Sequence, residues 1–207
     1  MNNDEVYAAG LLKRALDPAT QPPEIQAYLR AEVELLPRLV HDRMRVLDLG
    51  CGTGRHLILL QDRLQLGLGV DYERRYIAEA VARAGARQLH FVVGDATAVP
   101  TTSEFDFAMC LTNTWGTMSD KAGVLNEMRR LAPRPHTRLL SVYSETSMAA
   151  RRGWYLRLSH NVVEETDEYL LTDGGLRSEH FSEGRIRSLV GECTIGPLSE
   201  IAYEVTF

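Results

Sequence analysis

Short apolar runs alternate with amphipathic stretches between residues 45 and 143. The apolar runs predict strands at Arg45–Leu49, Leu66–Asp71, Leu89–Val93, Phe105–Leu111 and Leu139–Tyr143. The stretches between them have apolar residues at helical spacing and predict helices around His56–Leu64, Arg74–Ala84 and Asp120–Leu131. The strands are apolar along nearly their whole length, which is typical of parallel strands that are covered on both faces. This alternation over short connections predicts an α/β fold with a doubly wound sheet, in which ligands bind at the carboxyl ends of the strands.

Residues 1–42 precede the first predicted strand and contain two helical patterns. The first is the short amphipathic stretch Val6–Leu12, and the second, Glu24–Val40, has apolar residues at near-helical spacing. Pro37 is expected to kink or end the second helix, because proline lacks the N–H that a helix interior needs. We expect the two helices to form a lid across the ligand end of the sheet. The alternative is that they only cover an edge of the sheet.

The pattern changes after the fifth predicted strand. Glu145–His160 is compatible with a helix, and the apolar stretches on either side of Asp173-Gly174-Gly175 predict a β-hairpin, since this sequence favours a tight reversal. A helix that starts at Ser182 and two closing strands, near residues 193–195 and 202–207, complete the pattern. The prediction is a single domain, 1–207, which consists of a lid (1–42), a ligand-binding core (43–144), an insert with the hairpin (145–181) and the closing helix and strands (182–207).

Composition narrows the class of protein. A chain of 207 residues is long enough for one substantial core, and its net charge of −5 argues against general nucleic-acid binding, which needs a basic face. It shows neither an apolar run long enough to span a membrane nor the pattern of a signal peptide. Cys51, Cys110 and Cys193 are widely spaced and form no metal-binding pair. We therefore expect a cytoplasmic protein without a metal, a monomer or homodimer, whose partner is a small molecule rather than nucleic acid or membrane.

A glycine-rich turn, Gly50-Cys51-Gly52-Thr53-Gly54, separates the first predicted strand from the helix that follows. Glycine tolerates positive φ and has no Cβ, so a ligand can approach the backbone closely. The first N–H groups of the helix lack intrahelical partners and can bind a ligand. Asp71 ends the second strand about 20 residues further on, where a carboxylate binds ribose in nucleotide-binding βαβ units. These features predict a site for a nucleoside cofactor.

Two further acidic positions extend this pattern. Asp48 lies in the strand end just before the first glycine, and Gly94-Asp95-Ala96 follows the third strand. The Asp-x-Gly-x-Gly-x-Gly turn, together with the acids after the next two strands, resembles the class I S-adenosylmethionine-dependent methyltransferases over roughly residues 40–145. The resemblance implies a Rossmann-like, seven-stranded, mostly parallel sheet with helices on both faces, and S-adenosyl-L-methionine as the cofactor.

The resemblance also implies individual roles. In that family the glycine turn contacts the methionine part of the cofactor, the acid after the second strand binds the ribose hydroxyls, and the Asp after the third strand binds the adenine amino group. The residues at these positions are Asp48, Gly50, Cys51, Gly52 and Gly54 in the turn, Asp71 and Tyr72, Gly94, Asp95 and Ala96, and Leu111 at the end of the fourth strand. A carboxylate suits ribose hydroxyls, which are donors. Helix capping or turn formation is the alternative role for Asp71 and Asp95.

Methyl transfer requires that the acceptor and the methyl group are aligned, that water is excluded and, for some acceptors, that a proton is removed. The loop Cys110–Met118 follows the fourth strand and is expected to lie over the methyl group, with Asn113 and Trp115 towards the substrate. It is not the Asn-Pro-Pro-Tyr sequence of members that act on nucleic-acid bases or glutamine side chains. It more closely resembles small-molecule members of the glycine N-methyltransferase kind, which implies an amine nitrogen or a hydroxyl oxygen as the acceptor.

Further candidates lie outside this loop, and ordinary packing or surface positions are the alternative for each of them. The predicted catalytic residues are Tyr7, Asn113, Tyr143 and His160, and the predicted substrate-binding residues are Asn113, Trp115, Trp154, Tyr155 and His180. Two other functions remain open at this point. A nicotinamide-dependent oxidoreductase shares the strand, glycine turn and acid, although the glycine spacing and Asp48 count against it. A cofactor-binding module with a degenerate active site is the other.

Overall fold

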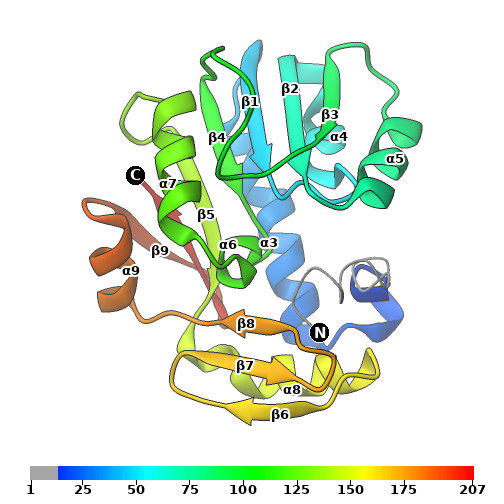
Figure 1. The fold of residues 1–207 in the computed structure, drawn as a ribbon, viewed down its shortest axis with the longest axis vertical. Helices are drawn as coiled ribbons and strands as arrows, with labels where there is room; N and C mark the ends of the chain where they lie inside the picture. Colours follow the sequence, from blue (N-terminus) through cyan, green and yellow to red (C-terminus); the bar gives the residue numbers. More distant parts are fainter. Residues whose placement is uncertain (1–13) are drawn as a thin grey trace.

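The computed structural model describes residues 14–207, so the predictions for Val6–Leu12 and Tyr7 lie outside the described residues. Its centre is a seven-stranded sheet with the strand order β3-β2-β1-β4-β5-β10-β9 (Figure 1). The strands β1 to β5 run parallel, whereas β10 pairs antiparallel with β5 and β9. The bounds are β1 Met44–Leu49, β2 Leu64–Asp71, β3 Leu89–Val93, β4 Phe107–Cys110, β5 Arg138–Tyr143, β9 Thr194–Ser199 and β10 Ala202–Thr206. The predicted α/β fold with a mostly parallel sheet is confirmed.

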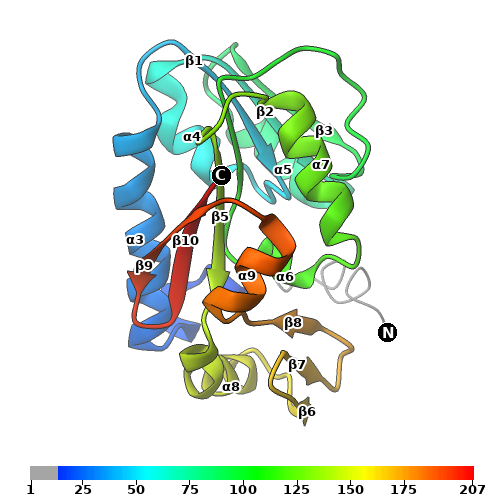
Figure 2. The same ribbon diagram turned by 90° about the vertical axis from the view of Figure 1, so that its left-hand side faces the viewer.

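Helices cover both faces of the sheet, as Figure 2 shows from the side. The helices α3, α4 and α5 pack on one face, where Leu36, Leu57 and Ile77 are buried. The helices α7 and α9 pack on the other face through Met128 and Ile186. Their bounds are α3 Pro23–Leu39, α4 Arg55–Leu60, α5 Arg74–Arg83, α7 Lys121–Leu131 and α9 Glu183–Val190. Burial on both faces is the reason why the central strands are almost continuously apolar.

The end of α4 differs from the sequence-based prediction, whereas α3 ends within one residue of the predicted end at Val40. α4 ends at Leu60, and a 3₁₀ turn follows before Leu64 begins β2 with its side chain in the core. Pro37 lies inside α3 instead of ending it. The N–H of Val40 donates to the carbonyl oxygen of Leu36 at 2.9 Å, and both side chains are fully buried on the sheet. Packing of this last turn therefore outweighs the missing N–H of the proline.

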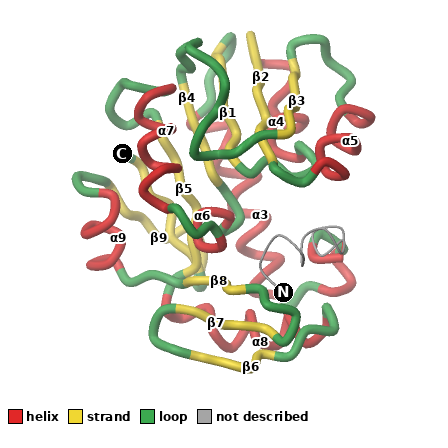
Figure 3. Tube along the Cα trace, in the orientation of Figure 1, coloured by secondary structure: helices red, strands yellow, loops and turns green. Residues whose placement is uncertain are grey.

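Residues 145–181 form an insert beyond the carboxyl ends of the parallel strands (Figure 3). It consists of a 3₁₀ turn Glu145–Ser147, the helix α8 Met148–Arg157 and an antiparallel sheet of β6 Val162–Glu165, β7 Tyr169–Thr172 and β8 Arg177–Glu179. The sequence predicted the hairpin of β7 and β8 but missed β6, whose side chains are mostly exposed and follow no apolar pattern. Trp154 and Tyr155 of α8 pack with Tyr28 and Leu29 of α3, so the insert is joined to the N-terminal helix.

The strand order reverses between the neighbouring strands β1 and β4. At such a switch point the loops after the two strands diverge and leave a crevice at the carboxyl edge of the sheet. Within residues 14–207, no helix is long and apolar enough to cross a membrane. The same residues contain no group of three His, Cys, Asp or Glu side chains that could hold a metal ion.

Candidate functional site

A cavity of about 930 Å³ lies at this carboxyl edge, between the main sheet and the insert. It is lined by the loops that follow β1, β2, β3 and β4 and, on the far side, by β8. Its walls include Asp48, Gly50, Cys51 and Gly52 from the first loop, Asp71 and Tyr72 from the second, Gly94, Asp95 and Ala96 from the third, Leu111 from the fourth, and Arg177 and Glu179 from β8. The structure thus brings together the predicted cofactor-binding residues, with the exception of Gly54.

The two outer glycines of the turn have different tasks. Gly50 lies on the cavity with φ +71°, and a Cβ at this position would lie well inside 3.0 Å of Thr114 Cγ2. Gly54, with φ +74°, lies off the cavity, and a Cβ there would be 2.6 Å from the ring of Phe91. Only glycine adopts such a backbone conformation readily and leaves this space. Gly50 therefore keeps the turn open at the cavity, whereas Gly54 lets the turn pack closely on β3, which corrects the expected cofactor contact at Gly54.

Backbone N–H groups hold the carboxylate of Asp71 at the cavity wall. Its Oδ2 accepts the N–H of Gly52 at 2.8 Å, and its Oδ1 accepts the N–H of Glu73 at 2.9 Å. Burial raises the pKa of Asp71, and these two hydrogen bonds oppose that rise. Each carboxylate oxygen can accept a second hydrogen bond, so Asp71 can still bind donors of a ligand. Asp95 is exposed at the rim, where its Oδ1 accepts the N–H and the hydroxyl of Thr97, both at 2.8 Å.

Asp48 is the buried acid of the site. Its Oδ2 has no hydrogen-bond partner, and the nearest ring nitrogen of His56 lies 3.9 Å away. Burial raises the pKa of Asp48 to about 8, and the neighbouring acids Asp71 and Glu32 add to the rise although Arg55 opposes it. A buried polar atom without a partner is costly. Asp48 therefore fits a ligand that brings a cationic donor into the cavity.

A second buried acid, Glu32 of α3, contacts the wall of the cavity. Its carboxylate accepts the N–H of Thr112 at 2.5 Å and the Thr112 hydroxyl at 2.9 Å, and it also accepts hydrogen bonds from Ser141 and Arg55. Although burial by itself raises the pKa of Glu32, the charge of Arg55 and the nearby His56, whose Nε2 lies 3.4 Å from Glu32 Oε2, bring it down to about 2. Arg55 lines the cavity and also donates to the hydroxyl of Thr112 at 2.7 Å. Glu32 thus fixes Thr112, the second residue after β4.

The sequence analysis missed Glu32, although a signal was present. The buried side chains of α3 follow one helical face, and Glu32 lies on that face between apolar residues; they are Ile25, Tyr28, Leu29, Glu32 and Leu36. A charged residue on the apolar face of a helix is rarely buried unless it is paired. Its presence there could have indicated a buried polar contact with another element.

The core that carries the glycine turn matches a known family. Residues 46–134 match the family model described as a methyltransferase domain. The enzyme class and the cofactor predicted from the sequence are thus confirmed, namely a class I methyltransferase that uses S-adenosylmethionine. The match decides against the nicotinamide-dependent oxidoreductase. No curated protein matches the chain significantly.

Solved structures show the same fold. A protein from Pyrococcus horikoshii has a TM-score of 0.70 and 16% identity, covering 89% of this chain and 91% of its own. A magnesium protoporphyrin IX methyltransferase from Synechocystis, with bound S-adenosylhomocysteine, has a TM-score of 0.63 and 15% identity over 99% of this chain and 95% of its own. A possible histamine N-methyltransferase from Thermotoga maritima has a TM-score of 0.59 and 19% identity, covering 87% of this chain and 88% of its own. Because the sequence identities are this low, the similarity to these structures shows a shared fold and nothing more.

In the methyltransferase, the side-chain amide of Asn113 makes hydrogen bonds within the protein. Asn113 follows β4 with φ +54°, and its side-chain oxygen accepts the N–H of Tyr143 at 3.0 Å. Its side-chain nitrogen donates to the carbonyl oxygen of Glu179 at 3.1 Å and lies 3.3 Å from Ser178 Oγ. The amide therefore joins the end of β5 to β8 of the insert. It does not line the main cavity but lines the small recess beside it, so the catalytic contact of Asn113 stays a prediction.

Trp115 lies in the short helix α6, Thr114–Thr117, which forms within the predicted loop. Its ring is fully buried and stacks on Phe181 with centroids 5.0 Å apart, and its Nε1 donates to the carbonyl oxygen of Lys121 at 3.1 Å. The turn of α6 directs the ring into the core on the α7 side of the sheet. Trp115 is therefore a packing residue, and the expected substrate contact is absent.

The two candidate histidines line no part of the cavity. His160 follows α8, and its Nδ1 lies 3.8 Å from Asp173 Oδ1 within the insert. His180 is buried beside Arg151, whose Nη1 is 3.2 Å from its Nδ1, and burial together with this charge lowers the pKa of His180. The predicted base at His160 and the predicted substrate contact at His180 are therefore not placed at the site. Tyr143, Trp154 and Tyr155 line a small recess beside the main cavity.

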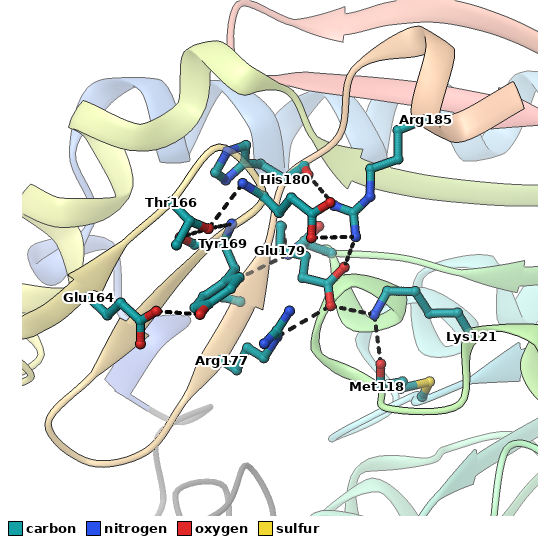
Figure 4. A network of polar contacts seen from close by, with 12 residues as sticks. Met118, Lys121, Glu164, Thr166, Tyr169, Arg177, Glu179, His180 and Arg185 are labelled. Carbon is teal, nitrogen blue, oxygen red and sulfur yellow. Dashed lines mark hydrogen bonds and ion pairs between the residues drawn. The ribbon is translucent and has the colours of Figure 1, made fainter. Parts of the chain in front are cut away.

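Ion pairs anchor β8, the far wall of the cavity (Figure 4). Glu179 Oε1 accepts a hydrogen bond from Lys121 Nζ at 2.9 Å, and its Oε2 accepts one from Arg185 Nη2 at 2.6 Å. Although burial raises the pKa of Glu179, these two cations keep it below its usual range. Lys121 also donates to the carbonyl oxygen of Met118 at 2.8 Å. The insert is thereby attached to the loop after α6 and to α9, a connection that the sequence did not indicate.

Proposed function

We propose that this methyltransferase transfers a methyl group to the amine nitrogen or hydroxyl oxygen of a small molecule. The observation that carries the proposal is that one cavity runs from the glycine turn and Asp71 to β8 of the insert. Its volume of about 930 Å³ falls in the range of small-molecule sites, about 300–1,000 Å³. It has room for an acceptor beside a cofactor, with Thr112, Thr117 and Arg177 as polar walls on the acceptor side.

The residues present fit S-adenosylmethionine. The glycine turn and Asp48 would hold the methionine part, whose ammonium group is the cationic donor that the unpartnered Asp48 Oδ2 lacks. Asp71, fixed by two backbone N–H groups, would accept hydrogen bonds from the ribose hydroxyls, and Asp95 would bind at the adenine side. The cofactor supplies an electrophilic methyl group on its sulfonium. The chain itself has to orient the acceptor and exclude water.

We favour an amine over a hydroxyl. His56 is the histidine among the described cavity walls, and burial together with Arg55 lowers its pKa to about 4, which makes it a poor proton acceptor near neutral pH. Glu179 is held by two cations and has a lowered pKa. An amine that binds in its neutral form needs no strong base. The resemblance to glycine N-methyltransferases and the likeness to a possible histamine N-methyltransferase support the same choice.

Calorimetric titration with S-adenosylhomocysteine tests the cofactor half of the proposal. Wild-type protein should bind it, and Asp71→Asn should weaken binding by about 1–3 kcal/mol, the cost of leaving buried donors of the ligand without an acceptor. Asp62→Asn is the matched control, because Asp62 is exposed in the turn after α4. Absence of binding at millimolar concentration would contradict the cofactor, and unchanged affinity in Asp71→Asn would contradict the ribose assignment.

Measurements of turnover test the proposed class of methyl acceptor. Formation of S-adenosylhomocysteine should be measured with panels of amines, phenols and alcohols, carboxylates and thiols. We expect turnover with amines above all. Turnover confined to carboxylates or thiols would contradict the acceptor class. Cofactor binding without turnover on any panel would favour the remaining alternative, a binding module with a degenerate active site.

A further inference from the structure

A recess of about 50 Å³ adjoins the main cavity on the side of the insert. Its walls are mostly aromatic and aliphatic and include Tyr143, Trp154, Tyr155, Leu158 and Leu176. These side chains come from β5, from α8 and the residue after it, and from the turn before β8. The polar residues of the lining are Thr112, Asn113, Thr117 and Ser178. Native protein cores leave few voids larger than a water molecule. A space of this size beside the cavity can therefore take part of a bound molecule.

The recess opens towards the main cavity. Leu16, Thr112 and Thr117 line both spaces. These three are half-buried, whereas the other described residues that line the recess are buried. The three half-buried residues thus form the border that the recess shares with the main cavity. A group inside the recess would belong to a molecule that also occupies the main cavity near Thr112.

The walls favour an apolar occupant. None of the described side chains that line the recess is charged. The amide of Asn113 is already used by Tyr143, Ser178 and Glu179. The rings of Trp154 and Tyr155 stack with centroids 5.9 Å apart and present mainly carbon surface, and the indole N–H of Trp154 is a neutral donor without a hydrogen-bond partner among the described residues. Burying a charged or strongly polar group among these walls would be costly.

The volume limits the size of the occupant. A cavity of about 150 Å³ lined by apolar side chains holds a benzene molecule. The recess is smaller, about 50 Å³, and so suits an alkyl group of roughly one to three carbons. We propose that the recess is a specificity subsite that takes a short alkyl group of the methyl acceptor, while the nucleophilic nitrogen or oxygen stays in the main cavity. The acceptor is then a small aliphatic amine or alcohol with a short alkyl branch, an inference that rests on the proposed function.

Xenon binding tests whether the recess can hold an apolar group when no methyl acceptor is present. Wild-type protein saturated with S-adenosylhomocysteine is exposed to xenon, and the side-chain methyl signals of leucine are followed by NMR. The signals of Leu158 and Leu176 should shift, and that of the exposed Leu59 should not. Absence of a shift at Leu158 and Leu176 would overturn the inference whatever the turnover results are.

A homologous series of acceptors tests specificity. With amines whose alkyl branch grows by one carbon at a time, kcat/KM should rise about fourfold per carbon up to about three carbons and then fall. Leu158→Ala deepens the recess and should move the optimum to longer branches. Leu156→Ala, an exposed position on α8, is the matched control and should leave the profile unchanged. A profile independent of branch length, or one that Leu158→Ala does not move, would contradict the subsite.

The two measurements separate the possible failures. Turnover of amines without xenon binding would overturn the subsite and leave the proposed function standing. Xenon binding without turnover of any acceptor would overturn the proposed function, and the subsite with it. The xenon measurement uses wild-type protein, so it remains decisive if Leu158→Ala fails to fold.

Discussion

The carboxylate of Glu32 accepts the backbone N–H of Thr112 at 2.5 Å, although the two residues are 80 positions apart in the chain. Glu32 belongs to α3 and is fully buried there, and Thr112 is the second residue after β4 and lines the cavity. Thr112 adopts φ +55°, an uncommon value for a threonine. The contact therefore stabilises an unusual backbone conformation in the wall of the cavity.

Removing this carboxylate should destabilise the protein. Glu32→Ala leaves Arg55 without its charge partner and removes the carboxylate that accepts from Ser141 and from the N–H of Thr112, which then keeps only Ser141 Oγ at 2.8 Å. Breaking a buried ion pair costs about 3–5 kcal/mol, and we expect the lower end because Arg55 is partly exposed. Urea unfolding measures the loss. Glu34→Ala changes an exposed acid on the same helix and should stay within about 0.5 kcal/mol of wild type. Equal stability of both variants would contradict the role of Glu32.

Asp48 should make stability depend on pH. Its pKa is about 8 in the folded protein and near 3.8 in the unfolded chain, so between these values the folded state holds the extra proton. The free energy of unfolding should therefore fall as pH rises from about 4 to about 8 and level off above. Comparison of wild type with Asp48→Asn isolates this contribution, because the variant cannot titrate. A difference between the two that stays constant over this range would contradict the raised pKa.

The carboxyl group of Asp48 should also couple cofactor binding to proton release. A cationic ammonium near Asp48 favours the ionised carboxylate and lowers its pKa, so binding near neutral pH should release a proton. Calorimetry with S-adenosylhomocysteine in two buffers of different ionisation enthalpy measures the release. Asp48→Asn should abolish it. Release that persists in the variant would assign the proton to another group.

Gly50 and Gly153 offer a matched pair of substitutions. Gly50→Ala requires φ +71° from an alanine and places its Cβ against Thr114, so it should destabilise the turn and weaken cofactor binding. A Cβ on Gly153 in α8 meets nothing within 4 Å, so Gly153→Ala should be neutral or stabilise by about 0.5–1 kcal/mol. Thermal unfolding and calorimetry distinguish the two. A tolerated Gly50→Ala with wild-type affinity would show that the turn has room to relax.

The meeting of the glycine turn with the acids after β2 and β3 at one cavity could be predicted from the sequence, because its signals are local. The glycine turn, Asp71 and Asp95 each lie directly after an apolar run, and parallel strands bring their carboxyl ends to one edge of the sheet. The helices α5, α7 and α9 followed from periodicity within single segments. The strand β6 did not, because its side chains are mostly exposed and carry no apolar pattern.

The acceptor side was decided by the tertiary structure. Asn113 and Trp115 lie where the sequence places them along the chain, yet the turn of α6 directs Trp115 into the core and the amide of Asn113 binds β8. Glu32 and Glu179 face their partners only because α3 and the insert pack against the ends of β4 and β5. The sequence by itself determined the fold and the methyl donor, since both depend on patterns within short segments. Which side chains line the rest of the cavity depends on contacts between segments far apart in the chain, and those exist only in the folded protein.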